Sequence, residues 1–515
     1  MKAPYKQPQG VSSSLWQQMW AAAGHDLKLG LVPVATSRGQ LVGEGLPPLV
    51  GEVAGLGFDF SRNLVSANSW GLLRKYSVAR GAASFWQAVA DGEPVNRTEN
   101  RTASHMSWRD PSSAPAQHEP FFSLLSSLGV TDAEGSPRFD RVLNVGIGGS
   151  EFGPNLLAQA QVGIEDLNQR YVSLSSITPT HLRQVLKTVD LERSAVVVSS
   201  KSFTTGETMR LARQLKSQFE NQGLSWRDNF FAVTAEPQKA LAWGFTPNHV
   251  LDMTKSVGGR YSVASPIGFS FALAYGLGAF ASFRAGMKSV DEAVARDPGQ
   301  SAPLSHALIW FWYRVFFNLQ SVAVIPYVPQ WRLLTGYLQQ LLMESLGKSF
   351  DSQGHPVNTP VGSVVLGEVG TNAQHSFMQY LQFSTTAVPA DLIGALSFES
   401  DDDFADFQLA NLFAQSQALL FGAGESTNEL DPPGGRPSNL LLTRDDSLKS
   451  LGEVISFYEH STLFQAALYD VNPFDQWGVE AGKKIAAKLF GRIPTPSLKV
   501  ALEFFGNGIT GRFGS

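Results

Sequence analysis

The chain of 515 residues contains no cysteine, and this absence excludes a first group of functions. Without thiols there are no disulfide bonds, no cysteine nucleophile and no zinc–thiolate site. Histidine pairs of metal-binding spacing are missing too, because no two of the nine histidines fall within five positions of one another. We therefore expect neither a metal ion nor another cofactor.

The chain also lacks a strong excess of charge of either sign, because its net charge is −5 and only 17% of its residues are charged. A nucleic-acid partner is not expected from so even a balance. The first eight residues lack the apolar core of a secretion signal. Two apolar stretches, 266–283 and 308–328, are expected to be buried rather than to cross a membrane, because the first is rich in Gly, Ala and Ser and the second contains Arg314. These features, with the missing cysteines, predict a cytoplasmic protein.

Nucleotide-binding signatures are absent at the turns that could have carried them. Gly146 and Gly148 begin a G-x-G-x-x-G pattern, but its third position is Glu151, whose carboxylate would oppose a pyrophosphate. No G-x-x-x-x-G-K-[ST] loop is present either. What remains around Gly149 and Ser150 is either a turn that brings backbone close to a small ligand or a merely tight turn.

From residue 141 onward, short β-branched runs alternate with helical segments, which predicts α/β architecture. The expected strands are 142–147, 171–174, 195–199 and 230–233, with helices 152–160, 179–188, 205–222 and 237–243. After an apolar helix at 302–320, a second unit has expected strands 321–327, 363–366 and 392–396 and helices 331–346, 374–383, 404–421 and 448–469. The fold class is therefore two doubly wound units with parallel-sheet cores.

The N-terminal part is less informative. Residues 1–60 are rich in Gly and Pro and are expected to form a wrapping arm rather than a core element. Residues 68–90 are expected to be helical. The polar stretch 96–113 is expected to be a loop, and its function does not follow from pattern.

The stretch 196–208 runs from a valine-rich strand through hydroxyls and a lysine into a helix. Unpaired amide N–H groups at such a helix start carry partial positive charge, and Ser200, Ser202 and Thr205 add hydroxyl donors beside Lys201. The pattern favours an anion site. An ordinary Ser/Thr N-cap would account for one or two of the same hydroxyls.

Two further positions combine a charge with an unusual setting. Arg260 follows Gly258 and Gly259, which allow a sharp turn that can aim a guanidinium at a developing oxyanion, although a loop salt bridge is equally compatible. Glu344 and Gln340 are four residues apart and share one face of a mostly apolar helix. A carboxylate there indicates a general base if it is buried, or an amphipathic surface if it is not.

The remaining candidates are weaker when taken alone. His375 follows Gly370-Thr371-Asn372-Ala373-Gln374 at a strand-to-helix junction and is expected in the first turn of the helix. Gln476 and Lys483 are seven residues apart and lie on one face of a C-terminal helix, as they would on any solvated helix.

Together and in this order, the motifs resemble those of the glucose-6-phosphate isomerase (phosphoglucose isomerase) family. The resemblance extends from about residue 59 to the C-terminal helix and rests on two signatures, Val257-Gly258-Gly259-Arg260-Tyr261-Ser262 and Phe474-Asp475-Gln476-Trp477-Gly478-Val479-Glu480 with Lys483. Gly-Gly-Ser at 148–150, Ser-Lys-Ser-Phe-Thr-Thr at 200–205, Met-Glu-Ser at 343–345 and Gly-Thr-Asn-x-Gln-His at 370–375 follow the family order.

The resemblance implies a metal-free aldose–ketose isomerisation of glucose 6-phosphate to fructose 6-phosphate through a cis-enediol, in glycolysis and gluconeogenesis. It implies that Glu344 is the base and that Arg260 stabilises the enediolate. It assigns ring opening to His375 and Lys483, with Glu207 orienting His375. The implied substrate-binding residues are Gly149, Ser150, Ser200, Lys201, Ser202, Thr205, Gln340 and Gln476.

The resemblance also implies a homodimer in which His375 is supplied across the interface. Its domains would be an N-terminal arm with helices (1–112), a small sugar-isomerase domain (113–275), a large one (276–470) and a C-terminal helix and arm (471–515). Ser202, Gly206 and Leu341-Leu342 depart from frequent family residues without removing a catalytic group. A catalytically silent sugar-phosphate sensor is the alternative class, but it would not need Glu344, His375, Arg260 and Lys483 together. Activity on mannose 6-phosphate is left open.

Overall fold

The computed structural model describes residues 5–29, 49–112, 114–162, 170–175, 178–398, 403–422 and 430–490. The chain forms two bodies, residues 1–473 and 474–515. In the second body the described part contains a 3-10 turn, Trp477–Val479, and the helix α17, Glu480–Phe490. Both sheets belong to the first body. The predicted division of that body near residue 275 stays a prediction.

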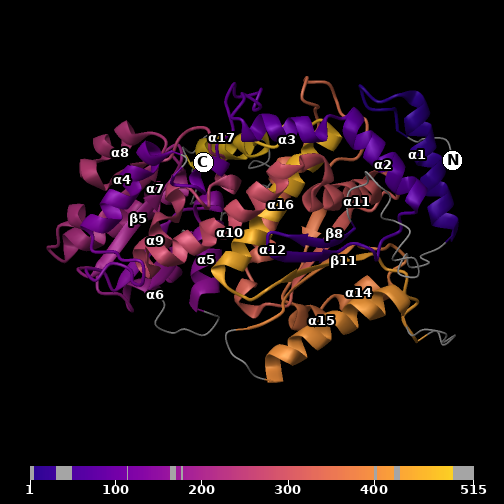
Figure 1. Cartoon of the computed structure of the whole chain (residues 1–515). Coiled ribbons are helices and arrows are strands. Elements are labelled where there is room, and N and C mark those ends of the chain that lie inside the picture. The colour runs from indigo at the N-terminus through magenta and orange to yellow at the C-terminus, as the bar shows by residue number, and fades with distance from the viewer. Residues whose placement is uncertain are drawn as a thin grey trace, which may run out of the picture. The chain divides into compact units, whose positions relative to one another are not determined.

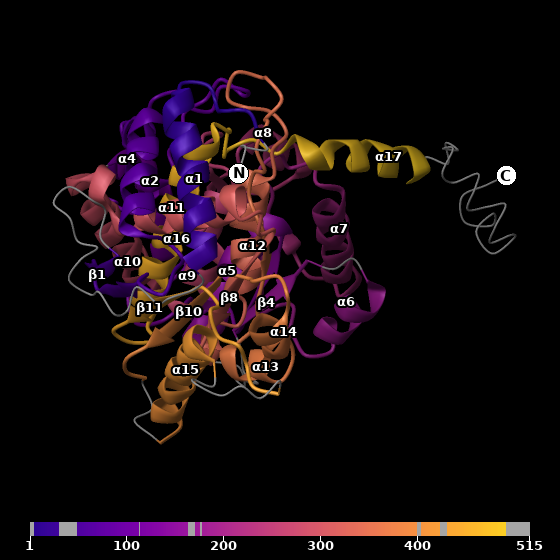
Figure 2. The same cartoon turned by 90° about the vertical axis from the view of Figure 1, so that its right-hand side faces the viewer.

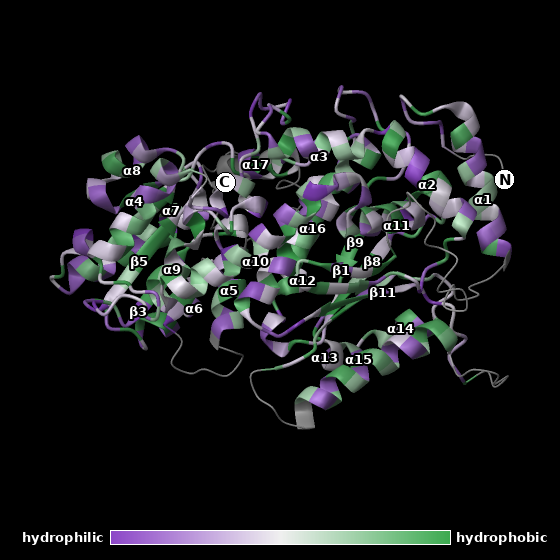
Figure 3. Ribbon diagram, viewed as in Figure 1, coloured by the Kyte–Doolittle hydropathy of each residue, from purple (hydrophilic) through white to green (hydrophobic). Residues whose placement is uncertain are grey.

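The first sheet has five parallel strands in the order β4-β3-β5-β6-β7. Helices α6, α7 and α8 cover one face, where their apolar side chains join those of the strands in one core, and α5 and α9 contact β3 and β4 on the other. Because both faces are covered, β5 is buried along its whole length and appears green in Figure 3. The predicted alternation is confirmed, while the three-residue strand β7 and the seven-residue helix α9 were missed. The elements are β3 (Arg141–Val145), α5 (Phe152–Val162), β4 (Tyr171–Leu174), α6 (Pro179–Leu186), β5 (Ser194–Ser199), α7 (Gly206–Asn221), β6 (Phe230–Thr234), α8 (Pro237–Trp243), β7 (Val250–Asp252) and α9 (Phe269–Tyr275).

The second sheet has six strands in the order β1-β2-β11-β10-β8-β9, of which the last four are parallel. Figures 1 and 2 show α14 and α15 on one face of this sheet and α11, α12 and α16 on the other. The prediction of a second doubly wound unit is confirmed, while β11 was missed. The elements are α11 (Ala302–Phe316), β8 (Ser321–Pro326), α12 (Leu334–Leu346), β9 (Val364–Leu366), α13 (Gly370–Gln374), α14 (Met378–Phe383), β10 (Ala390–Ala395), α15 (Asp403–Phe421), β11 (Ser438–Thr443) and α16 (Leu448–Tyr469).

The expectation that residues 1–60 form only a wrapping arm is wrong for their last part. The hairpin of β1 (Val50–Val53) and β2 (Leu56–Asp59) pairs antiparallel with β11 and extends the sheet. Phe58 and Phe60 are buried and stack with centroids 5.0 Å apart. Helix α1 (Ser13–Leu29) also buries Trp16 and Trp20. Residues 30–48 lie outside the described residues.

Buried helices join the two sheets. Helix α10 (Leu277–Arg296) packs on α16, and Figure 1 shows both between the sheet that contains β5 and the sheet that contains β8. All residues of α16 except Lys449 are buried. Most residues of the two apolar stretches are buried, as predicted, while Ala281, Asn318 and Gln320 are exposed. No helix in the described part of the chain is both long and apolar enough to cross a membrane.

Two helix predictions need correction. The helix expected at 374–383 is two short helices, α13 and α14, so His375 caps the end of α13 instead of lying in a first turn. The helix expected at 68–90 is broken at Gly81, whose φ of 63° lies in the left-handed region. It forms α2 (Ala67–Ala79) and α3 (Ala82–Ala90), which are followed by α4 (Pro115–Ser127).

Candidate active site

The strand order of the first sheet reverses between β3 and β5, because the chain proceeds to β4 on one side and to β6 and β7 on the other. In open α/β sheets, ligands bind outside the carboxyl ends of the strands at such a point. The glycine-rich turn that contains Gly149 follows β3, and the Ser/Thr-rich turn that contains Ser200 follows β5. The topology therefore brings two of the predicted ligand-binding turns to one crevice.

The turn after β3 is held against the turn that carries Arg260. A Cβ atom on Gly149 would lie 2.1 Å from the carbonyl oxygen of Gly259, so only glycine fits this approach. Asn144 on β3 donates from Nδ2 to the carbonyl of Ser150 at 2.9 Å and fixes the other side of the turn. Ser150 and Arg260 thus come from neighbouring turns.

The turn after β5 presents hydroxyls at the start of the 16-residue helix α7. Ser200 is buried, and its Oγ lies 3.1 Å from Oγ1 of Thr205. Thr205 is the N-cap residue, but its side chain makes no capping hydrogen bond with the described residues. The ordinary N-cap explanation therefore does not account for it. Ser202 is exposed, and the helix start adds N–H donors and partial positive charge.

The backbone of this turn is constrained at Phe203. Its φ of 51° is unusual for a residue with a side chain. Burial of the Phe203 ring, edge-on to Phe245 with centroids 5.7 Å apart, holds that conformation. Such strain is found at functional sites, where the surrounding structure stabilises it.

Lys201 lies half-buried in the same turn. Burial lowers the pKa of Lys201, and the charges of Arg101 and Arg260 lower it further, while Glu99 raises it. No ion pair or side-chain hydrogen bond joins the ammonium group to another described residue. An anionic ligand would relieve this unfavourable arrangement of cations.

Arg260 and Glu344 meet at the end of α12. The Arg260 side chain is 1% exposed, and its Nη1 lies 3.4 Å from Oε2 of Glu344, which is 30% exposed. Arg260 also donates from Nε to Ser345 Oγ at 2.7 Å and from Nη2 to the carbonyl of Pro473. The guanidinium is thus fixed on several sides, and the carboxylate beside it remains accessible.

A buried polar network supports the backbone of Arg260. The Tyr337 hydroxyl lies 3.3 Å from the Arg260 carbonyl and 3.5 Å from Oε1 of Glu459. Arg109 pairs with Glu459 and Asp291, and although burial opposes it, these carboxylates raise the pKa of Arg109. Sequence reasoning missed this network. The signal was present, because Glu459 is a carboxylate in a helix as apolar as the one that carries Glu344.

The other predicted residues are placed as follows. Gln340 reaches the turn after β3, since a Cβ on Gly148 would lie 3.0 Å from its Nε2. Glu207 and His375 are exposed, and among the described residues they form no hydrogen bond or ion pair with each other. Gln476 and Lys483 belong to the second body.

Other constellations do not form an alternative site. Ser461, His306 and Asp391 are linked by contacts of 2.7 and 2.8 Å in the order of a hydrolase triad, but all three are fully buried, out of reach of a substrate. The described residues contain no group of three or more side chains placed to hold a metal ion.

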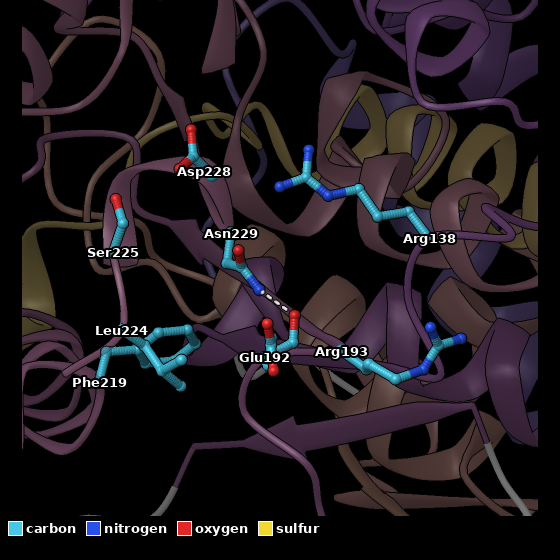
Figure 4. A pocket seen from close by; sticks show the side chains of 8 residues that line it. All are labelled: Arg138, Glu192, Arg193, Phe219, Leu224, Ser225, Asp228 and Asn229. Atoms are coloured by element: carbon cyan, nitrogen blue, oxygen red, sulfur yellow. Dashed lines mark hydrogen bonds between the residues drawn. The ribbon is translucent and has the colours of Figure 1, made fainter. Parts of the chain in front are cut away.

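A cavity of about 530 Å³ lies at the ends of the strands of the first sheet that are opposite to the predicted ligand-binding turns (Figure 4). Arg138, Arg193 and Asn229 line it. Arg193 and Asn229 immediately precede β5 and β6, and Arg138 lies three residues before the start of β3. Arg193 is already paired with Asp140 through contacts of 2.5 and 2.6 Å. The cavity therefore lies at the amino ends of the strands, away from the edge at which such sheets bind ligands.

Comparisons with known proteins identify relatives of the chain. A family model described as phosphoglucose isomerase matches residues 127–502. The glucose-6-phosphate isomerase of Burkholderia multivorans is 37% identical over 462 residues, which cover 83% of this chain and 84% of that protein. The Burkholderia mallei enzyme of the same name is 37% identical over 461 residues, with coverages of 84% and 85%.

Solved structures give the same result. The crystal structure of a glucose-6-phosphate isomerase from Chlamydia trachomatis matches with a TM-score of 0.84 and 29% identity, covering 96% of this chain and 98% of that one. A hypothetical protein from Thermus thermophilus matches with a TM-score of 0.64 and 25% identity, covering 81% and 96%.

Proposed function

The chain belongs to the phosphoglucose isomerase family, and on this premise we propose that it interconverts glucose 6-phosphate and fructose 6-phosphate. The observation that carries the proposal is the placement of Glu344 against the buried guanidinium of Arg260, beside the two ligand-binding turns. The proposal includes a cytoplasmic role in glycolysis and gluconeogenesis, as the resemblance implies.

The phosphate is proposed to bind the turn after β5, through Ser200, Ser202, Thr205 and Lys201. Gly149 and Ser150 would bind next to it, because their turn ends at the same crevice. Holding the phosphate at one end positions the reacting carbons, so that binding energy from a remote group lowers the barrier to reaction.

The proton transfer is assigned to Glu344. Its carboxylate would take the proton from C2 of the open-chain aldose while the C1 carbonyl becomes the enediolate oxygen. A proton would then pass from the C2 hydroxyl to that oxygen, and Glu344 would return its proton to C1 as the C2 carbonyl forms. One base can serve both carbons because they are adjacent. That the intermediate is a cis-enediol and that no metal takes part are implied by the family resemblance. Arg260 would stabilise the enediolate, and its bonds to Ser345 and Pro473 hold it in place beforehand.

The remaining roles follow from the resemblance. His375 and Lys483 would open the sugar ring, Glu207 would orient His375, and Gln340 and Gln476 would bind sugar hydroxyls. We propose that His375 acts in the site of a partner subunit of a homodimer. The exposure of His375 is compatible with that arrangement.

A coupled assay tests the proposal. Fructose 6-phosphate is supplied to protein treated with a chelator, and glucose 6-phosphate is measured through its dehydrogenase. We expect full turnover after chelation. Failure of the folded protein to form glucose 6-phosphate would refute the function, and activity that is lost on chelation and restored by metal would refute the metal-free mechanism.

A further inference from the structure

The segment 95–101, which sequence reasoning left without a function, forms a tight hairpin anchored to the site. Asn96 and Arg101 pair through backbone bonds of 3.0 and 3.1 Å. Asn472 donates from Nδ2 to Asn96 Oδ1 at 2.9 Å and to Thr98 Oγ1 at 2.8 Å. Asn472 precedes Pro473, whose carbonyl accepts from Arg260. The hairpin is therefore tied to the same piece of chain that holds Arg260.

The chain leaving the hairpin is tied to the Arg260 turn as well. Ser104 Oγ lies 2.6 Å from Ser256 Oγ, and the Ser104 amide donates to the Ser256 carbonyl at 3.2 Å. His105 packs against Tyr261 with ring centroids 4.8 Å apart and the ring planes tilted by 39°. These contacts fix the hairpin relative to the site.

Within the hairpin, Glu99 is held and the donors of Arg101 are left available. Asn96 donates from Nδ2 to Oε2 of Glu99 at 2.7 Å, which fixes that carboxylate. Nη1 of Arg101 lies 3.8 Å from Oε1 of Glu99, too far for a hydrogen bond. No hydrogen bond joins the Arg101 guanidinium to any other described residue. Its side chain is 37% exposed, so a planar set of five N–H donors remains accessible.

The Arg101 charge lies close enough to the phosphate turn to act on Lys201. Arg101 and Glu99 both act electrostatically on Lys201, with opposite signs, and Arg260 acts on it as well. The cations Arg101, Lys201 and Arg260 thus lie near one another. Glu99 is the carboxylate that acts on Lys201. Like charges held together by a rigid backbone are unfavourable unless an anion enters between them.

We propose that Arg101 is a further binding residue for the substrate phosphate. When the sugar phosphate enters, its phosphate group replaces Glu99 as the counter-ion of Arg101. In the free protein, Glu99 partly neutralises the guanidinium without using its hydrogen-bond donors. A phosphate bound at the turn after β5 offers oxygens that suit a guanidinium. The inference rests on the proposed function for the identity of this anion.

Two substitutions with opposite expected effects test the proposal. Arg101→Gln should weaken binding of inorganic phosphate, measured by calorimetry, and raise the KM for fructose 6-phosphate about fivefold, as expected for one partly exposed charge-assisted contact, with kcat nearly unchanged. Glu99→Gln keeps the acceptor for Asn96 but removes the competing charge, so it should tighten phosphate binding about twofold. A merely structural hairpin would be weakened by either change.

Arg97→Gln is the matched control, because it removes the same charge from an exposed position of the same hairpin. Phosphate binding by Arg101→Gln equal to that by Arg97→Gln would overturn the inference. If Arg101→Gln does not fold, unchanged or weaker binding by Glu99→Gln overturns it. If phosphate binding depends on Arg101 but the protein shows no isomerase turnover, the inference stands and the proposed function is refuted. If the protein turns over substrate but phosphate binding does not depend on Arg101, the proposed function stands and the inference is refuted.

Discussion

At the scale of single residues, the contact between Arg260 and Glu344 is the centre of the candidate site. Arg260 and Glu344 stand out because a charge in a glycine turn or on an apolar helix needs a reason. Their direct contact, and the bonds of Arg260 to Ser345 and Pro473, join residues far apart in the chain. No local pattern predicts such contacts.

Gly149 gives a prediction at this scale. In Gly149→Ala the new Cβ would lie 2.1 Å from the Gly259 carbonyl oxygen, so the two turns must separate. We expect the free energy of unfolding to fall by about 1–3 kcal/mol, as for other overpacked sites. We also expect kcat to fall, because Arg260 moves with its turn. Urea unfolding and the coupled assay measure the two effects.

The control is Gly71→Ala in the interior of α2, where an added Cβ meets no described atom within 4 Å. This variant should be stabilised by about 0.5–1 kcal/mol and remain fully active, since alanine restricts the unfolded chain. Equal stability of the two variants would contradict the close approach at Gly149.

At the scale of elements, long periodic segments were predictable and short ones were not. The strands and helices between 141 and 243 follow the predicted alternation closely, because buried parallel strands need continuous apolar runs. The hairpin β1–β2 was missed because each of its four-residue strands contains a glycine and because the hairpin joins the sheet through the pairing of β2 with the distant strand β11.

Contact between that hairpin and α16 predicts a pH dependence of stability. Glu453 on α16 is 3% exposed, and a Cβ on Gly55 in the β1–β2 turn would lie 3.2 Å from its Oε1. Burial raises the pKa of Glu453 to about 7, above its ordinary value of 4.5. The charged groups that act on it are Lys449, Asp445, Arg444 and Glu52.

Because the folded state holds this proton more tightly, the contribution of Glu453 to stability is complete below about pH 4.5 and is lost as the pH rises through about 7. The loss is on the order of 3 kcal/mol at most. Glu453→Gln cannot ionise, so its stability relative to the parent should increase between pH 5 and 8 when both are unfolded in urea. A constant difference over this range would show that the pKa is not raised.

At the scale of the whole molecule, the two sheets repeat one topology. The order β9-β8-β10-β11 in the second sheet corresponds to β4-β3-β5-β6 in the first. In the first sheet, the serine-rich turn that contains Ser200 follows β5. In the second sheet, Tyr327 follows β8. Its buried ring packs against Gly370 so closely that a Cβ on Gly370 would lie 2.4 Å from the ring. The sequence predicted two parallel units, but not the order of their strands, which depends on pairings between distant segments.

The proposed exchange of His375 between subunits also belongs to this scale. Glu344→Gln and His375→Ala should each be nearly inactive alone, since each lacks one group that every site needs. In a two-fold symmetric dimer that combines one chain of each kind, one site has both groups intact and the other has neither.

Mixing these two inactive variants, with dissociation and reassociation, is the most direct test of an isomerase site built from Glu344 of one subunit and His375 of the other. Random pairing makes half of the dimers mixed, so we expect about a quarter of the parent activity to return. Activity that stays at the level of the separate variants, although mixed dimers have formed, would contradict the account.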